Sequence, residues 1–229
     1  MKPFPYQLIG RKFLAERKRA LLADTMGLGK TAQAIIGADD TGAATILIIC
    51  PASVCINWQR EFKKFSAVNR EYKIIDKGTS PPITDAVNII SYDLATRKPM
   101  KDWLEKMAWD LLILDEAHYL KNRAAKRTAA IYGTHCKAEN GIISKATRCW
   151  ALTGTPTPNH PGEIYSLLRA FGVWKENYFA FEEKFCETKM GDYGPIVTGM
   201  KKEAMPQLKS MVMPIMLRRK KEDVLKDLP

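Results

Sequence analysis

The stretch "ALLADTMGLGKTAQAI", residues 20–35, decides the fold. The apolar residues before Asp24 predict a short buried strand, and the pattern that starts at Lys30 predicts a helix. Between them, Gly27 and Gly29 let the backbone turn tightly and point its N–H groups inward, where a Cβ would block an approaching phosphate. A strand, a glycine loop and a helix N-terminus in this order are typical of a nucleotide phosphate site.

The loop also offers a cation and a metal ligand. We expect Lys30 to lie against the β and γ phosphates and the Thr31 hydroxyl to bind Mg²⁺. Asp24 stands where the common GxxxxGK[ST] pattern has its first glycine, so a bare glycine turn is the alternative interpretation. The residues expected to hold the nucleotide through this loop are Met26, Gly27, Leu28, Gly29, Lys30 and Thr31.

A second motif, "WDLLILDEAHYL" at residues 109–120, places Asp115 and Glu116 at the end of an apolar strand. Ligands of open α/β sheets bind at that end. We expect Asp115 to hold Mg²⁺ through its water shell and Glu116 to orient and deprotonate the attacking water. Adjacent carboxylates in an apolar setting are costly to desolvate unless a cation faces them, which disfavours a purely structural role. His118 either links this site to neighbouring loops or caps the turn.

A third strand ends in small polar residues. In "WALTGTPTPN", residues 150–159, an apolar run is followed by Thr153, Gly154 and Thr155. Small hydroxyls and a glycine at a strand end suit close approach to a phosphate or to the carboxylate motif. An ordinary turn is the alternative, because turns use the same residues.

Strand and helix patterns alternate along the chain. The helical pattern Ser53–Phe65 lies between two of the apolar runs, and such alternation implies parallel strands joined by right-handed crossovers. We therefore predict one three-layer α/β domain, residues 1–229, with a central, mainly parallel sheet. Irregular loops are expected at Gly133–Lys145 and Thr188–Gly199. The predicted strands are Ala20–Ala23, Thr45–Cys50, Tyr72–Ile75, Val87–Ser91, Leu111–Leu114 and Cys149–Leu152.

Composition narrows the function classes. Lys and Arg number 36 against 25 Asp and Glu, giving a formal charge of +11 that favours polyanions such as nucleic acid. Scattered surface lysines are the alternative. The 5 cysteines form no CxxC pair and the 3 histidines have no ligand spacing, so we expect a reducing compartment and no structural zinc. No segment approaches the roughly 20 apolar residues of a membrane span. We expect a monomer in the cytoplasm, or in the nucleus if the source has one.

The motifs occur in a specific order: "PYQLIG", "DTMGLGKT", "ICPASVCINWQREF", "IISYDL", "DEAHYLKN", "LTGTPTPN", "EIYSLLRAF" and "IMLRRKKEDVLKDLP". Over nearly the whole chain this set resembles the first RecA-like lobe of SWI/SNF-type ATPases in helicase superfamily 2. The resemblance implies ATP and Mg²⁺ as cofactors and a DNA-dependent ATPase that moves along double-stranded DNA. It also implies that Gln7 reads adenine and that His118, Thr153, Gly154 and Thr155 couple the nucleotide to motion.

The resemblance sets further expectations. The second RecA-like lobe is absent from this chain, and with it the arginine finger, which is worth about 10³ to 10⁵ in rate in other NTPases. The 229 residues alone should therefore bind nucleotide weakly and hydrolyse it slowly. "NIISYDL" and "NYFAFEEKFCETKMGDYG" look like the annealing-helicase, fork-remodelling branch, with roles such as fork regression or branch migration in DNA repair and recombination. Thr25 departs from the acidic residue usual in the family, and Tyr119 departs from an arginine.

A motor that moves along any DNA sequence should grip phosphates rather than base edges. In "KNRAAKRT", residues 121–128, the basic residues have helical spacing, and a solvated helix face is the alternative. Trp58 and Trp103 either stack on bases or pack in the core, and the methionine-rich stretch Met200–Met216 is expected to be apolar fill beside the second lobe. The residues that the family resemblance places at DNA are Pro51, Ser53, Ser91, Tyr92, Lys121, Asn122 and Arg123.

Two other functions remain open. One is a non-hydrolysing DNA-binding or regulatory module that keeps the phosphate loop as a scaffold. The other is a P-loop kinase or a different NTPase, which does not explain the "DEAH" and "LTGTP" strands together.

Overall fold

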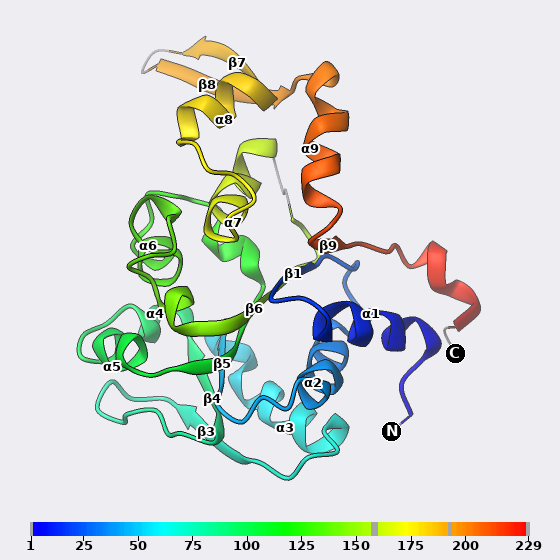
Figure 1. The fold of residues 1–229 in the computed structure, drawn as a ribbon, viewed down its shortest axis with the longest axis vertical. Helices are drawn as coiled ribbons and strands as arrows, with labels where there is room; N and C mark the ends of the chain where they lie inside the picture. Colours follow the sequence, from blue (N-terminus) through cyan, green and yellow to red (C-terminus); the bar gives the residue numbers. More distant parts are fainter. Residues whose placement is uncertain (1, 157–159, 192–193, 228–229) are drawn as a thin grey trace.

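The computed structural model describes residues 2–156, 160–191 and 194–227, so the end of the third motif, residues 157–159, lies outside them. A seven-stranded sheet runs through the molecule in the order β3-β4-β2-β5-β6-β1-β9, and every pair in it is parallel (Figure 1). Six of these strands confirm the predicted ones. The strands are β1 (Arg19–Leu22), β2 (Ile46–Cys50), β3 (Glu71–Ile75), β4 (Ala86–Ser91), β5 (Trp109–Asp115), β6 (Ala146–Leu152) and β9 (Met216–Leu217).

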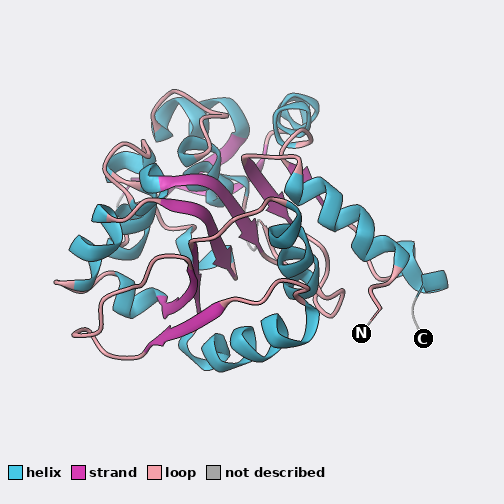
Figure 2. Cartoon of the chain, turned by 60° about the horizontal axis from the view of Figure 1, so that its bottom comes forward, coloured by secondary structure: helices cyan, strands magenta, loops and turns pink. Residues whose placement is uncertain are grey.

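Each central strand divides its apolar side chains between two cores. Successive side chains of a strand point to opposite faces, and because both faces are covered the strands are continuous apolar runs. In β2, Ile46 and Ile48 face one core, whereas Leu47 and Ile49 face the other. The predicted three-layer architecture is therefore confirmed (Figure 2).

The two helix layers differ in their elements. One core contains residues of α1 (Pro5–Ala15), α2 (Lys30–Asp40) and α3 (Cys55–Phe65). The other core packs α4 (Tyr92–Ala95), α5 (Met100–Lys106), α6 (Lys126–Tyr132) and α7 (Tyr165–Ala170) against the sheet. The helix predicted over Ser53–Phe65 is α3, preceded by the 3₁₀ helix η1 (Ala52–Val54).

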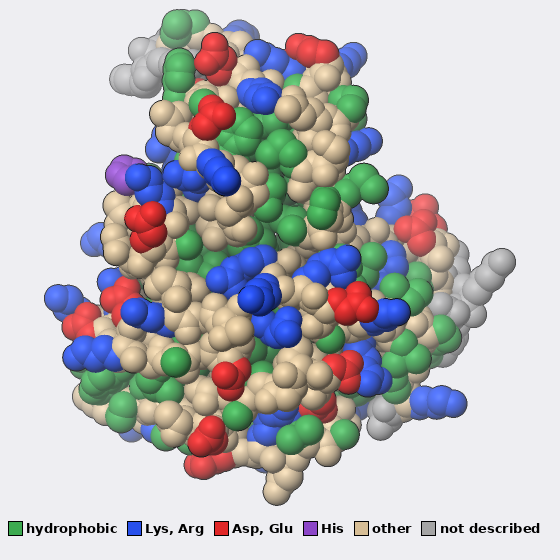
Figure 3. Space-filling view, in the orientation of Figure 1, with side chains coloured by type: hydrophobic (Ala, Val, Ile, Leu, Met, Phe, Trp, Pro, Cys, Tyr) green, Lys and Arg blue, Asp and Glu red, His purple; other side chains and the backbone are tan. Residues whose placement is uncertain are grey.

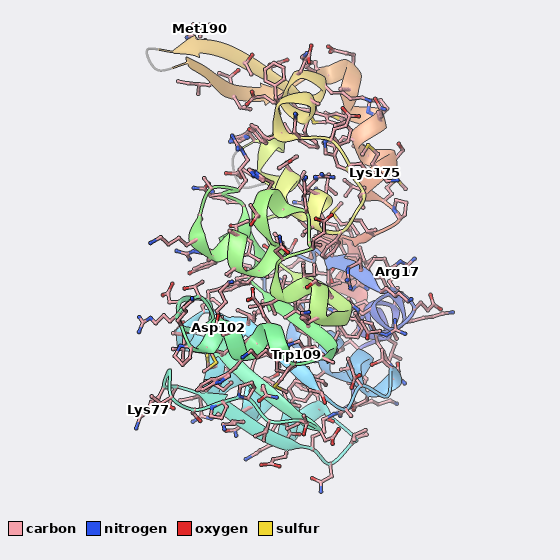
Figure 4. All side chains as sticks on the ribbon, turned by 60° about the vertical axis from the view of Figure 1, so that its left-hand side comes forward. Arg17, Lys77, Asp102, Trp109, Lys175 and Met190 are labelled. Atoms are coloured by element: carbon pink, nitrogen blue, oxygen red, sulfur yellow. The ribbon has the colours of Figure 1, made fainter. Side chains whose placement is uncertain are left out.

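The prediction of an irregular loop over Thr188–Gly199 is wrong. That segment lies in an antiparallel hairpin of β7 (Cys186–Gly191) and β8 (Gly194–Met200), which follows α8 (Tyr178–Phe185). Most of β7 is exposed, so the alternating burial that marks a strand in sequence is missing. Figure 4 places Met190, which is 80% exposed, at the outer tip of this hairpin and Lys77 at the opposite end of the molecule.

Two further expectations need correction. The stretch Gly133–Lys145 contains two 3₁₀ helices, η3 (Thr134–Cys136) and η4 (Ile142–Lys145), with buried apolar side chains, so it is not simply a polar loop. The basic stretch after the "DEAH" motif is not one helix. Its first residues follow η2 (Ala117–Leu120), and α6 begins only at Lys126.

The methionine-rich stretch Met200–Met216 has regular structure of its own. It forms the 3₁₀ helix η6 (Lys202–Ala204) and α9 (Met205–Val212), which buries Leu208 and Val212, and it ends in β9. There Met216 pairs with Leu21 and Leu217 with Leu22, so the chain returns to the sheet beside β1. Met205 and Met213 are the exposed large apolar side chains of the stretch.

All five cysteines are free and buried. Within residues 2–156, 160–191 and 194–227, no group of histidine, cysteine and carboxylate side chains could hold a metal by itself. In the same part of the chain, no helix has the length and apolar character needed to cross a membrane.

The aromatic cluster under α8 provides a test of the packing. Phe181 is fully buried against Trp174, Phe185 and Tyr165, whereas Phe179 on the same helix is 69% exposed. Phe181→Ala should lower the free energy of unfolding by about 3–5 kcal/mol, because it leaves a cavity. Phe179→Ala should change it by less than about 0.5 kcal/mol. Urea denaturation of both variants measures the difference, and equal effects would contradict the packing described.

Candidate active site at the carboxyl edge of the sheet

The predicted site residues converge because neighbouring parallel strands end at the same edge. Asp24 follows β1, Thr153 follows β6, and Asp115 is the last residue of β5. These strands are adjacent in the sheet, and Leu152 of β6 pairs with both Leu22 and Asp115. Three motifs that are far apart in sequence therefore meet at one edge, where ligands of open α/β sheets bind.

The phosphate loop has the backbone that its glycines allow. Gly27 and Gly29 have φ values of 88° and 65°, which L-residues rarely adopt, and Gly29 is the residue that precedes α2. Lys30 and Thr31 are the first two residues of that helix. The free N–H groups of the helix N-terminus and its partial positive charge are thus at the loop, as anion binding requires.

Lys30 lies among the carboxylates of the site. Its Nζ donates to the backbone carbonyl of Asp24 at 2.9 Å. Burial lowers the pKa of the Lys30 ammonium below its ordinary value, while the negative charges of Glu116, Asp24 and Asp115 oppose that shift. The structure therefore brings the lysine of the first motif and the acids of the second into one electrostatic neighbourhood.

Two donors orient the Asp115 carboxylate. The indole N–H of Trp58 donates to Oδ2 at 2.8 Å, and the backbone N–H of Glu116 donates to Oδ1 at 3.0 Å. The Tyr92 hydroxyl donates to the Asp115 carbonyl at 2.8 Å. Burial raises the pKa of the Asp115 carboxyl, the Trp58 hydrogen bond counteracts this, and the charge of Glu116 raises it again. A cation placed here would relieve the cost of the buried charge.

The third motif contacts the other two. His118 Nδ1 lies 3.1 Å from Glu116 Oε2 and 3.3 Å from Thr153 Oγ1, and the Thr155 N–H donates to Thr153 Oγ1 at 3.1 Å. His118 thus connects the end of β5 to the end of β6, rather than only closing a turn.

Gly154 lies directly against the phosphate loop. A Cβ added to it would be 2.9 Å from Met26 Cγ and 3.6 Å from Lys30 Nζ. A side chain at this position would force Met26 to move. The third motif is therefore in place to respond to what the loop and Lys30 hold.

Gln7 lies on the other side of the loop. It is buried on α1, its Oε1 accepts from the Phe4 N–H at 3.0 Å, and its Nε2 would be 2.5 Å from a Cβ at Gly29. Tyr6, Leu28 and Val224 form a small buried apolar cluster beside it, against which Phe4 packs. Phe4 is the partly exposed member of this group, and an apolar ring next to a side-chain amide is a suitable environment for a nucleobase.

The residues present fit Mg²⁺-bound nucleotide. Gly27 and Gly29 give the loop positive φ values without a Cβ, and Lys30 supplies positive charge. Two adjacent carboxylates, one of them partly buried with a raised pKa, provide the hard oxygen ligands that Mg²⁺ prefers. Thr31 and Asp115 would hold the metal.

A family profile described as the SNF2-related domain matches residues 6–229. The chain belongs to this family. A solved structure of the SWI2/SNF2 ATPase core of Sulfolobus solfataricus in complex with dsDNA superimposes with a TM-score of 0.80 at 28% identity. The match covers 100% of this chain and 47% of the archaeal one. The fold is accordingly that of a SNF2-type ATPase lobe.

Similar proteins include members of the predicted branch. The SWI/SNF-related matrix-associated actin-dependent regulator of chromatin subfamily A-like protein 1 homolog of Caenorhabditis elegans is 34% identical over 234 residues, which is 99% of this chain and 32% of the relative. The DNA annealing helicase and endonuclease ZRANB3 of Bos taurus is 30% identical over 243 residues, which is 100% of this chain and 22% of the relative. The chain thus spans a third or less of these relatives.

Four of the residues predicted to contact DNA lie at the neighbouring strand ends. Pro51 and Ser53 follow β2, Ser91 is the last residue of β4, and Tyr92 follows it. Tyr92 does not offer its side chain to DNA, because its ring is only 2% exposed and stacks on Tyr119. The sequence could not show this, because a tyrosine beside a strand end is compatible with either position.

The hollow at these strand ends is not strongly basic. It measures about 420 Å³, and Asp76, Asp93 and Arg97 are the charged residues that line it. Two carboxylates against one guanidinium are a poor setting for phosphate. Any contact to DNA here would therefore depend on backbone groups and hydroxyls such as those of Ser53 and Ser91.

The three residues after the "DEAH" motif that are predicted to contact DNA differ in how free their side chains are. Lys121 forms an ion pair with Glu163 at 2.8 Å, so its charge is largely neutralised, whereas Asn122 and Arg123 are exposed. Arg123 lies over the Tyr178 ring and borders a hollow of about 610 Å³. Figure 3 shows Lys and Arg side chains gathered there, between α6 and α8. The charged or titratable residues of the hollow are Arg123, His135, Lys137, Arg169 and Glu182.

Sequence reasoning missed the role of Trp58. It left the ring either stacked on bases or packed in the core; the ring is buried, and its indole N–H also reaches Asp115. A buried tryptophan needs a hydrogen-bond partner, which was the one available signal. Which partner it finds depends on the crossover that brings α3 beside β5.

Trp58→Phe tests this contact. It removes a donor that lowers the pKa of Asp115, so that pKa should rise further above its ordinary value of about 3.9. Mg²⁺ requires the ionised carboxylate, so Mg²⁺-dependent nucleotide binding should be lost at a higher pH during acidification than in the wild type.

Fluorescence titration of a labelled ATP analogue with Mg²⁺ across pH measures this shift. Trp103→Phe, on α5 in the other helix layer, is the matched control and should keep the wild-type profile. Overlapping profiles for Trp58→Phe and the wild type would mean that the indole does not tune Asp115.

Proposed function

We propose that this chain is the ATP-binding lobe of a DNA-dependent ATPase that translocates on double-stranded DNA. The observation that carries the proposal is the convergence of Lys30, Asp115 and Glu116 at one strand edge. Lys30 and the loop N–H groups would bind the β and γ phosphates, and Thr31 and Asp115 would hold Mg²⁺, which neutralises charge that develops on the transferred phosphoryl group. Glu116 would orient and deprotonate the attacking water.

The chain's own residues also suggest how hydrolysis is coupled to movement. His118 joins Glu116 to Thr153, and Gly154 lies against Met26 and Lys30. A change in the contacts of Lys30 would therefore alter the position of the segment after β6. We infer that a second RecA-like lobe, with an arginine finger, completes the site, so that the 229 residues alone hydrolyse ATP slowly.

Duplex or branched DNA is the proposed partner. The archaeal ATPase core with a TM-score of 0.80 was solved with dsDNA, and the relatives include a DNA annealing helicase. The positive charge of +11 and the exposed Arg123 support contacts to phosphates rather than to base edges. Fork regression or branch migration is the process that these relatives favour.

The alternative is a DNA-binding module that no longer hydrolyses ATP. The intact set of Lys30, Thr31, Asp115 and Glu116 favours the enzyme, because paired carboxylates at a buried strand end are costly without a cation to hold.

Substitution of the two catalytic groups distinguishes these functions. With a second lobe fused or added, Lys30→Ala and Glu116→Gln should each reduce DNA-stimulated ATP hydrolysis by about 10²-fold or more, because phosphate charge or water activation is lost. Glu116→Gln should still bind nucleotide, whereas Lys30→Ala should bind it weakly. Phosphate release assays with and without DNA measure the rates. Unchanged turnover in both variants would rule out the ATPase and favour the DNA-binding module.

A charge substitution tests the DNA contact separately. Arg123→Ala should weaken duplex binding equally for all sequences and reduce the slope of log affinity against log salt by about 1. Lys12→Ala, an exposed lysine on α1, is the control and should leave the slope unchanged. Fluorescence anisotropy with two unrelated duplexes provides the measurement. A sequence-dependent loss, or an unaltered slope for Arg123→Ala, would remove Arg123 from the interface.

A further inference from the structure

A buried carboxylate lies at the entrance to the phosphate loop. Asp24 occupies the position where the common loop pattern has its first glycine, and its side chain has 0% exposure. The residue belongs to neither the metal site nor the water site described above. An ionised group without contact to water needs donors for both of its oxygens.

Arg219 supplies most of these donors from the far end of the chain. Its Nε lies 3.1 Å from Asp24 Oδ1 and its Nη2 lies 2.5 Å from Oδ2, so the guanidinium grips the carboxylate with two hydrogen bonds. The Arg219 backbone N–H donates to Oδ1 at 3.0 Å, and Gln33 Nε2 donates to Oδ2 at 3.1 Å.

The main chain reinforces the same contact. Ala23 N–H donates to the Leu217 carbonyl at 2.7 Å, and Thr25 N–H donates to the Arg219 carbonyl at 3.0 Å. The Thr25 hydroxyl is 3.3 Å from that carbonyl, which gives a role to a residue that departs from the family pattern. Lys221 follows and lies over Gly27. The segment after β9 therefore packs along the phosphate loop and is hydrogen-bonded to it.

Further hydrogen bonds link the Asp24–Arg219 contact to the nucleotide site. The Asp24 carbonyl accepts from Lys30 Nζ at 2.9 Å. Gln33, on α2, accepts from Arg219 Nη2 at 2.7 Å and donates to the Leu28 carbonyl at 3.0 Å. Arg219 Nη1 also donates to the Tyr6 carbonyl, next to Gln7. One guanidinium thus contacts the residues that fix the start of the loop, the helix behind it and α1.

We propose that Arg219 is a positioning residue for nucleotide binding, which acts by holding Asp24 and thereby the phosphate loop in its binding conformation. This inference rests on the proposed function for its activity readout. It also makes the segment after β9 a functional part of the nucleotide site, through which movements of the following chain would change the affinity for nucleotide.

Equilibrium binding of a fluorescent Mg²⁺–ATP analogue to the 229-residue chain tests this. Arg219→Ala should weaken affinity by about 10-fold or more, the loss typical when a residue that orients ligand-binding groups is removed. Arg219→Lys should recover only part of the affinity, because an ammonium cannot reproduce the two-pronged contact. Arg218→Ala is the matched control, since Arg218 is the exposed neighbouring arginine, and it should bind as the wild type does.

A double variant separates positioning from stability. Arg219→Ala leaves a buried charge unpaired and can destabilise the fold, whereas Asp24→Asn combined with Arg219→Met removes both charges and should recover much of the stability. If Arg219 positions the loop, nucleotide affinity should stay low in this double variant although its melting temperature recovers. Recovery of both properties together would reduce Arg219 to a structural role and overturn the proposal.

Amide hydrogen exchange over residues 24–30 provides a readout that needs no nucleotide. Exchange should be faster in Arg219→Ala and in the double variant, and unchanged in Arg218→Ala, relative to the global opening of each protein. Wild-type chain that binds no nucleotide would refute the proposed function, while this exchange measurement would still decide the inference. Unchanged loop exchange, or affinity within about twofold of the wild type for folded Arg219→Ala, would overturn it.

Discussion

The parallel alignment of the strands is the constraint on which the site depends. Since β1, β6 and β5 are neighbours and run in the same direction, the residues that follow them must lie at one edge. This places a lysine, two carboxylates and a threonine within reach of one another, although Lys30 and Thr153 are far apart in the sequence. An antiparallel arrangement of any of the three strands would move one motif to the opposite side of the sheet.

The electrostatics of the edge follow from that geometry. Burial disfavours the charged forms of both Lys30 and Asp115, but each charge lies in the field of the other. Asp115 also receives the Trp58 indole N–H and the Glu116 backbone N–H. The site therefore holds partly buried charged groups that all have partners, and partial burial strengthens their interaction with a bound cation and phosphate.

The sequence predicted those parts of the structure that local chemistry determines. The glycine loop, the six strands and the helix after β2 are encoded by apolar runs and by φ requirements at Gly27 and Gly29, and all are present. The β7–β8 hairpin was missed because its exposed residues do not alternate in polarity. β9 was missed because Met216 and Leu217 are too short a run to signal a strand, and their pairing with β1 is supplied by the fold.

Contacts between distant segments account for the rest. Nothing local in "IMLRRKKEDV" shows which of its two arginines turns inward, and Arg219 does so because β9 fixes the direction in which the chain leaves the sheet. In the same way, the burial of Tyr92 depends on Tyr119, and the partner of Trp58 depends on where α3 lies.

The short strand β9 has a mechanical consequence. Its two residue pairs lie upstream of Arg219, so tension that is transmitted along the chain as far as residue 219 meets the guanidinium–carboxylate contact before it reaches the strand. A force that reaches Arg219 but is too small to separate β9 from the sheet would still act on Asp24, and through it on the rim of the phosphate loop.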